Sequence, residues 1–222
     1  MQFAPLFPVL HQILSPLFPG CLWGGNSQRR EIALTFDDGP HPQHTPPLLD
    51  VLQQFQVQAS FFSLGCLVER SPAIIQDIYQ QGHWLGLHGY DHTSFPFLSQ
   101  TQLKTGLERT QQAIADICGI EPSQVRDVRP PNGVFTPQTL RWLQQWQYRP
   151  VMWSVVPEDW VRPGIQVVVK RVQQQTCNGS IIVLHDGYCG GEDVAAAIAQ
   201  LLPWLLDQGY QFVTIDQLWQ AQ

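Results

Sequence analysis

From Glu31 onward, short apolar runs alternate with helix-like segments along the 222-residue chain. This strict alternation predicts an α/β fold with parallel strands, because each crossover between parallel neighbours needs its own helix. About seven such units favour a closed or nearly closed barrel over a flat, doubly wound sheet. The predicted strands cover 32–36, 59–64, 84–88, 125–129, 151–155, 180–185 and 211–215, and the predicted helices cover 47–55, 72–81, 100–118, 137–146, 166–175 and 194–208.

Charged and polar residues fall at the ends of five of these predicted strands. In βα barrels the chemistry lies at the C-terminal strand ends, which meet on one rim. We therefore expect these side chains to form one site. They are Asp37 and Asp38 after the first strand, His88 and His92 after the third, Arg129 after the fourth, Asp159 and Trp160 after the fifth, and His185 after the sixth.

Residues 35–40, TFDDGP, place two carboxylates side by side where a buried strand ends. Two unit charges a few Å apart repel by about 1 kcal/mol in water, and by several times more near a protein interior. A metal ion, a shared proton or a nearby cation can compensate for this repulsion. Asp-Gly-Pro is also ordinary turn sequence, so the hexamer alone leaves a purely structural turn open.

His88 and His92 are spaced i and i+4, so a helical turn between them would point both imidazoles to one side. A catalytic zinc typically takes three protein ligands and leaves one position open. The two histidines and one aspartate of the pair complete such a set, and the other aspartate can act as general base. His185 can serve as general acid, with Arg129 and Asp159 holding these groups in register. The set predicts a metal-dependent hydrolase.

Five motifs occur in the order in which the polysaccharide deacetylases carry them, a group also called NodB-homology or carbohydrate esterase family 4. The resemblance runs from about Glu31 to Leu218, so we expect residues 1–30 to be an apolar extension and 31–222 to be the deacetylase domain. It implies a distorted (β/α) barrel and a divalent metal, usually zinc, that serves to remove acetyl groups from N-acetylated sugars or O-acetylated xylan. The motifs are TFDDGP, His-x-x-x-His, Arg-Pro-Pro-x-Gly, Asp-Trp and Leu-His-Asp.

Carried over by position, the resemblance implies a role for each motif residue. The catalytic residues would be Asp37 as base, His185 as general acid, Arg129 as the residue that orients the base, and Asp159. The metal ligands would be Asp38, His88 and His92. For substrate, Trp160 and Val183 would line the acetyl pocket, and Asn132, which follows Pro131, would stabilise the oxyanion through its backbone N–H.

Four residues depart from the family pattern. Gly89 stands where Ser or Thr is usual, Asn132 replaces a Tyr, Val156 replaces an Asp, and Val183 replaces a common Leu. The resemblance therefore implies an intact metal-and-base core with an atypical substrate groove. Because Asp159 is then the only acid of its motif, it can either pair with Arg129 or tune His185.

Composition excludes some other classes of function. A formal charge of −6, without a cluster of Lys and Arg, argues against a nucleic-acid-binding surface. Five cysteines without C-x-x-C spacing fit neither a disulfide scaffold nor a zinc ribbon. The apolar N-terminus lacks a basic start and contains repeated prolines, so it predicts neither a signal peptide nor a membrane span. We expect a cytoplasmic protein by default, with an exported or membrane-associated form as the alternative.

Three hypotheses for function follow. The first is deacetylation of an N-acetylated glycan of the chitin-oligomer or peptidoglycan type. The second keeps the site but changes the substrate to a small amide, imide or O-acetyl ester, and the third is a catalytically silent carbohydrate-binding relative. Zinc is the expected metal, although an Asp-His-His set also suits cobalt, nickel or iron. The sequence gives no indication of the oligomeric state.

Overall fold

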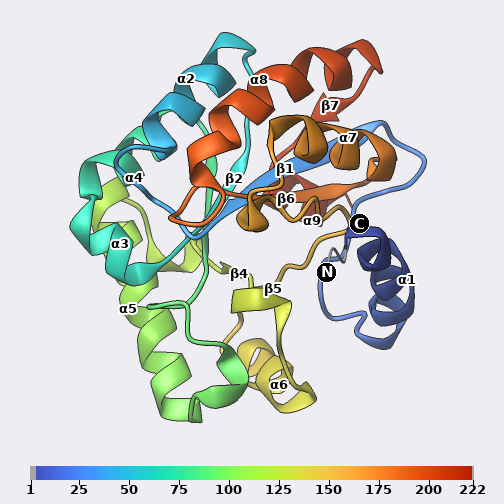
Figure 1. Cartoon of the computed structure of the whole chain (residues 1–222). Coiled ribbons are helices and arrows are strands. Elements are labelled where there is room, and N and C mark those ends of the chain that lie inside the picture. The colour runs from blue at the N-terminus through green and yellow to red at the C-terminus, as the bar shows by residue number, and fades with distance from the viewer. Residues whose placement is uncertain (1–3, 222) are drawn as a thin grey trace.

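Parallel strands form a curled sheet with helices packed around it in the computed structural model, which describes residues 4–221 (Figure 1). Across the sheet the order is β5-β4-β3-β2-β1-β6, and β7 pairs with the start of β1. Every pairing between these strands is parallel, which confirms the predicted α/β fold, a distorted (β/α) barrel. The strands are β1 (Glu31–Asp37), β2 (Ser60–Ser63), β3 (Trp84–Leu87), β4 (Asp127–Val128), β5 (Arg149–Pro150), β6 (Ile181–His185) and β7 (Gln211–Phe212).

The chain that follows β5 brings the two edges of the sheet together. Val151 donates its N–H to the Val128 carbonyl of β4 at 2.9 Å, and Val155 donates to the Ile181 carbonyl of β6 at 3.1 Å. The prediction of one continuous strand over 151–155 is therefore wrong. The segment instead forms two isolated parallel bridges, Val151 with Leu22 and Val155 with Ile182 of β6.

All six predicted helices are present, and they surround the sheet (Figure 1). Three further helices, α1, α3 and α9, lie in segments where the sequence predicts none. Short 3-10 turns fill several connections. The helices are α1 (Phe7–Leu17), α2 (Thr45–Gln54), α3 (Gly65–Arg70), α4 (Pro72–Gln80), α5 (Gln100–Cys118), α6 (Pro137–Gln145), α7 (Ile165–Gln175), α8 (Gly191–Asp207) and α9 (Ile215–Gln220), and the turns are η1 (Ala4–Leu6), η2 (Phe95–Phe97), η3 (Pro122–Gln124), η4 (Pro131–Gly133) and η5 (Asp159–Val161).

Helix α5 matches its predicted bounds at both ends because its sequence contains clear start and stop signals. At its start, the Ser99 side chain accepts from the backbone N–H of Gln102, whose own side chain accepts from the Ser99 N–H. Such a capping box satisfies donors that the first turn leaves unpaired. At its end, Gly119 adopts a left-handed conformation with φ 67°, which glycine reaches without steric cost.

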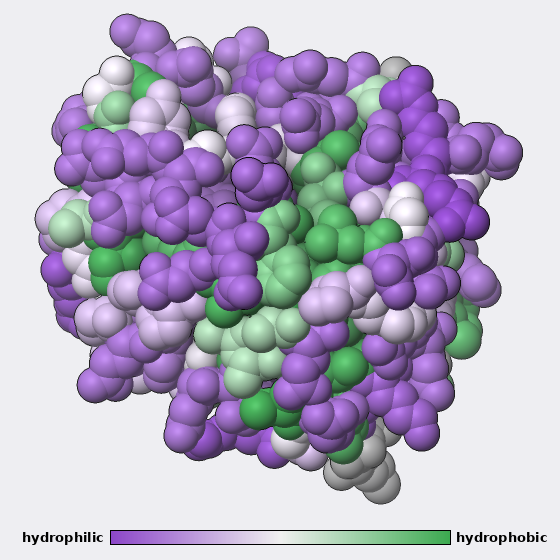
Figure 2. Space-filling view, turned by 90° about the horizontal axis from the view of Figure 1, so that it is seen from above, coloured by the Kyte–Doolittle hydropathy of each residue, from purple (hydrophilic) through white to green (hydrophobic). Residues whose placement is uncertain are grey.

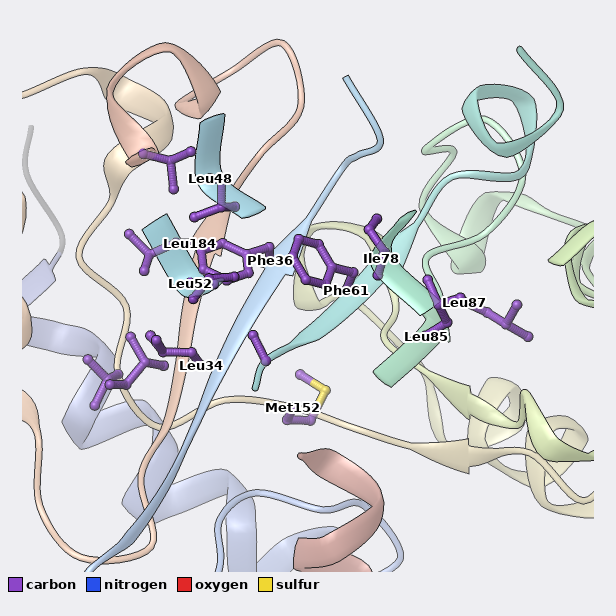
Figure 3. Close-up of a cluster of buried hydrophobic side chains, with 14 of the residues drawn as sticks. Leu34, Phe36, Leu48, Leu52, Phe61, Ile78, Leu85, Leu87, Met152 and Leu184 are labelled. Atoms are coloured by element: carbon purple, nitrogen blue, oxygen red, sulfur yellow. The ribbon is translucent and has the colours of Figure 1, made fainter. Parts of the chain in front are cut away.

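Strand β1 presents its side chains alternately to two different surroundings. Leu34 and Phe36 pack with Leu48 of α2 in the main apolar core between sheet and helices (Figure 3). Thr35 and Asp37 point to the opposite face, because successive side chains of a strand alternate. The alternation directs Asp37 into the barrel interior at the end of the strand, and only 3% of the Asp37 surface is exposed.

A buried carboxylate, Asp127, ties together the N-terminal ends of the strands. It accepts hydrogen bonds from the indole N–H of Trp84 at 2.7 Å and of Trp219 in α9 at 3.0 Å. Arg149 donates to the same carboxylate through Nε at 2.8 Å and Nη2 at 2.7 Å. This network anchors the last helix to strands β3, β4 and β5 at the end of the barrel opposite the predicted site.

Replacing Asp127 by asparagine is expected to lower the free energy of unfolding by about 3 kcal/mol, the low end for a broken buried ion pair. The amide would turn an N–H group toward donors that now face an acceptor, while Arg149 would keep Asp216 as a partner at 2.9 Å. Urea denaturation measures the change. Asp77→Asn, on the exposed surface of α4, is the matched control, and an equal loss in both variants would contradict the network's role.

Part of the N-terminal extension, Phe7–Leu17, forms helix α1, although this segment contains Pro8 and Pro16. Pro8 lies in the first turn of α1, where its missing N–H has no partner to lose. No helix within the described range 4–221 has the length and apolar character needed to cross a membrane. Seen from above, the surface is mainly hydrophilic, with hydrophobic residues gathered near its centre (Figure 2).

Candidate active site

The predicted rim exists, and the polar strand-end residues converge on it. Asp37 and His185 are direct register partners at the ends of β1 and β6. A pocket of about 340 Å³ opens between these strand ends. Of the residues that the sequence predicts for the site, Asp37, Asp38, His88, His92, Asn132, Trp160, Val183 and His185 line it.

Arg129 holds Asp37 from inside the barrel. Its Nη1 donates to Asp37 Oδ1 and to Thr35 Oγ1, both at 2.7 Å, and its Nη2 donates to the Met152 carbonyl at 3.0 Å. The guanidinium is fully buried over the ring of Phe62. Burial lowers the pKa of Arg129, and the adjacent Asp37 carboxylate opposes that shift. Arg129 therefore fixes one oxygen of Asp37 and leaves the other directed toward the pocket.

The role of Asp159, which the sequence left open, is decided by its contacts with His185. Asp159 Oδ1 accepts from His185 Nδ1 at 2.9 Å, and Oδ2 accepts from the His185 backbone N–H at 2.7 Å. Burial alone would lower the pKa of His185, but the charge and hydrogen bond of Asp159, together with the charges of Asp37 and Asp38, outweigh it and raise the pKa to about 9. Asp159 thus pairs with His185 and keeps the imidazole protonated at neutral pH.

Asp38, His88 and His92 place one ligand atom each within 4.8 Å of one another. The Nε2 atoms of His88 and His92 approach Asp38 Oδ1 to 3.3 Å and 3.2 Å. That oxygen is buried, and no hydrogen-bond donor among residues 4–221 satisfies it. A buried carboxylate oxygen faced by two imidazole nitrogens is a donor set that fits a divalent cation such as zinc.

Neighbouring backbone groups orient both histidines. His88 Nδ1 lies 2.8 Å from the Arg129 carbonyl; a carbonyl only accepts, so Nδ1 carries the proton and Nε2 is free to ligate. The chain between His88 and His92 does not form a helical turn, since Gly89 and His92 both have positive φ. The loop is instead held by the start of α3, where the N–H of Gly65 donates to the Gly89 carbonyl at 3.1 Å.

The residues predicted to bind substrate differ in whether they line the pocket. Trp160 packs its ring against His185 at 5.2 Å between centroids, and Val183 lies beside it in the lining. Asn132 adopts φ 58° and donates from Nδ2 to Ser94 Oγ at 2.9 Å. Pro131 is buried but is not among the lining residues. The lining further includes Phe7, Gly133, Trp153, Val156 and Cys189.

Two of these additional residues differ in how far the sequence could have revealed them. Trp153 lies within the segment predicted as the fifth strand, and the high Trp content of the chain is a signal for aromatic binding surfaces. Phe7 carries no such signal, because it belongs to an extension outside the motifs. Only the folded chain brings α1 to this pocket.

Comparisons with known proteins agree with this arrangement. The family model for polysaccharide deacetylase matches residues 24–151. A peptidoglycan-N-acetylglucosamine deacetylase of Bacillus cereus is 33% identical over 201 residues, covering 88% of this chain and 91% of the relative. A chitooligosaccharide deacetylase of a Bradyrhizobium species is 32% identical over 228 residues, covering 98% of this chain and 99% of the relative.

The fold is shared with solved members of the same group. A crystal structure of a peptidoglycan N-acetylglucosamine deacetylase in complex with 4-naphthalen-1-yl-N-oxidanyl-benzamide matches with a TM-score of 0.87 at 28% identity. The match covers 94% of this chain and 97% of the other. Together with the five ordered motifs and the strand-end site, these matches show that the chain belongs to the polysaccharide deacetylase family, the family 4 carbohydrate esterases.

Proposed function

We propose that the protein is a divalent-metal-dependent hydrolase that removes acetyl groups from N-acetylated glycans of the chitin-oligomer or peptidoglycan type. The observation that carries the proposal is the division of the two adjacent carboxylates. Asp37 pairs with Arg129, while Asp38 Oδ1 faces two histidine nitrogens and lacks a hydrogen-bond donor among the described residues. Adjacent acids with separate partners can perform separate tasks, one as base and one as ligand.

Asp38, His88 and His92 would hold the metal, expected to be zinc. When bound, a zinc ion of this kind polarises a carbonyl and lowers the pKa of water at its open position. The buried Asp38 oxygen supports this assignment, because a cation would supply the partner that it lacks among residues 4–221. Cobalt, nickel and iron suit the same donor set.

Three further residues of the pocket would transfer protons or stabilise the negative charge of the intermediate. Asp37 Oδ2 lies 3.9 Å from His88 Nε2, so the carboxylate is placed to take a proton from a water beside the ligands. His185, protonated with the help of Asp159, lies beside Asp37 at the end of the neighbouring strand and would give a proton to the departing amine nitrogen. Asn132 lies in the pocket lining, and its backbone N–H would donate to the oxyanion of the tetrahedral intermediate.

The choice of substrate class draws on the relatives and on the pocket. The two curated relatives are a peptidoglycan-N-acetylglucosamine and a chitooligosaccharide deacetylase. Apolar side chains that include Trp160 and Val183 line the pocket, and they suit the methyl group of an N-acetyl substituent. These features favour an N-acetylated glycan over a small imide or ester.

Acetate release from N-acetylglucosamine oligomers tests the proposal. Protein stripped by a chelator is expected to release no acetate, and zinc is expected to restore release at one equivalent per chain. Small acetylated amides and O-acetyl esters, assayed in parallel, separate the second hypothesis from the first. Metal binding without release from any of these compounds would reject deacetylation and leave a silent binding protein.

A further inference from the structure

The N-terminal helix reaches the candidate active site although it lies outside the deacetylase motifs. The Ala4 backbone N–H donates to Glu158 Oε2 at 2.8 Å, and the contact is buried. Glu158 directly precedes η5, the turn that carries Asp159 and Trp160. The turn η1, which leads directly into α1, is thus hydrogen-bonded to the segment that positions two residues of the site.

Phe7, in the first turn of α1, packs against two indoles of the pocket. Its ring centroid lies 5.7 Å from that of Trp153 and 6.3 Å from that of Trp160, with both pairs edge-to-face. Trp160 in turn packs against His185 at 5.2 Å. Aromatic pairs in this geometry hold each other's orientation. Phe7 therefore both lines the pocket and fixes the ring next to His185.

The pocket lining contains two kinds of side chain. The acids and histidines serve the proposed chemistry, whereas Phe7, Trp153, Val156, Trp160 and Val183 are apolar. An N-acyl substrate with its carbonyl at the acids and histidines would place its alkyl group against these apolar side chains. Val156 and Val183 are small, so most of the apolar bulk comes from the three aromatic rings, and the Phe7 ring contacts both indoles.

We infer that Phe7 is a specificity-determining residue that limits the acyl group to acetyl, an inference that rests on the proposed function. Its ring stands against both indoles, where a longer acyl chain would have to extend. The family model matches from residue 24 onward, so this role belongs to a segment outside that match. The N-terminal helix thereby forms part of the substrate site.

Phe7→Ala tests the inference with glucosamine trimers that carry either N-acetyl or N-butyryl groups. The ratio of kcat/KM for butyryl to acetyl is expected to rise at least about tenfold, since one methylene in an apolar pocket changes discrimination by that order. This ratio does not depend on the fraction of active protein, so partial unfolding leaves it unchanged. Phe7→Leu, which keeps an apolar side chain, is expected to give an intermediate ratio.

Val9→Ala is the matched control, because Val9 lies on the same helix with 51% of its surface exposed. Its ratio is expected to equal that of the unaltered protein. If Phe7→Ala lowers kcat/KM by the same factor for both trimers, the ring has a structural role only and the inference is overturned. Dissociation constants of the two trimers, measured by calorimetry, give a second ratio that needs no turnover. Absence of acetate release from the unaltered protein would instead reject the proposed function.

Discussion

Replacing Asp37 by asparagine is expected to lower kcat for acetate release by roughly 10²- to 10⁴-fold, the range for loss of a general base. The amide has nearly the shape of the carboxylate and still offers an oxygen to Arg129 Nη1, which now donates to Asp37 at 2.7 Å. It cannot accept a proton from water at neutral pH. The proposed ligands Asp38, His88 and His92 are untouched, so the bound metal per chain is expected to stay the same.

Asparagine separates loss of the base from loss of stability at this position better than alanine does. Alanine would leave the fully buried Arg129 without its carboxylate, and breaking a buried pair costs about 3–5 kcal/mol of stability. Asp50→Asn, on the exposed side of α2, is the control with the same chemical change. Acetate release and metal content are measured on the same preparations. Full activity of Asp37→Asn would exclude Asp37 as the base.

Replacing Asp159 by asparagine is expected to lower the pKa of His185 from about 9 toward its ordinary value of 6.5. Asp159 supplies the main charge and hydrogen bond that oppose burial, and the amide removes that charge. At pH 8 the imidazole would then be largely neutral and unable to give a proton to the amine. NMR titration of the ring in chelator-treated protein measures the pKa directly.

The same substitution has a consequence for stability. A histidine with a pKa raised in the folded state contributes stability that is fully present below pH 6.5 and is lost as the pH rises through about 9. Asp159→Asn is expected to remove this dependence, whereas Asp207→Asn at the exposed end of α8 is expected to keep it. An unchanged His185 titration in Asp159→Asn would show that other groups set its pKa.

The order of strand-like and helix-like segments was enough to predict the parallel α/β barrel and the place of the site. Apolar runs with a period suited to strands, separated by helical segments, admit few other folds, and strand ends of parallel units share one rim. The motif order led to residues that the fold gathers at one pocket, because the residue types suited to ligation and proton transfer are few. Helix α5 was predictable to the residue since Ser99 and Gly119 mark its ends.

Tertiary structure decided which of these residues touch. Asp159 could have paired with Arg129 or His185, and only the packing of η5 against β6 selects His185. The histidine loop needs no helical turn, because the start of α3 holds it through Gly89. Phe7 enters the pocket from an extension that no motif covers. Such contacts join positions far apart in the chain, and local sequence patterns report only on neighbours along it.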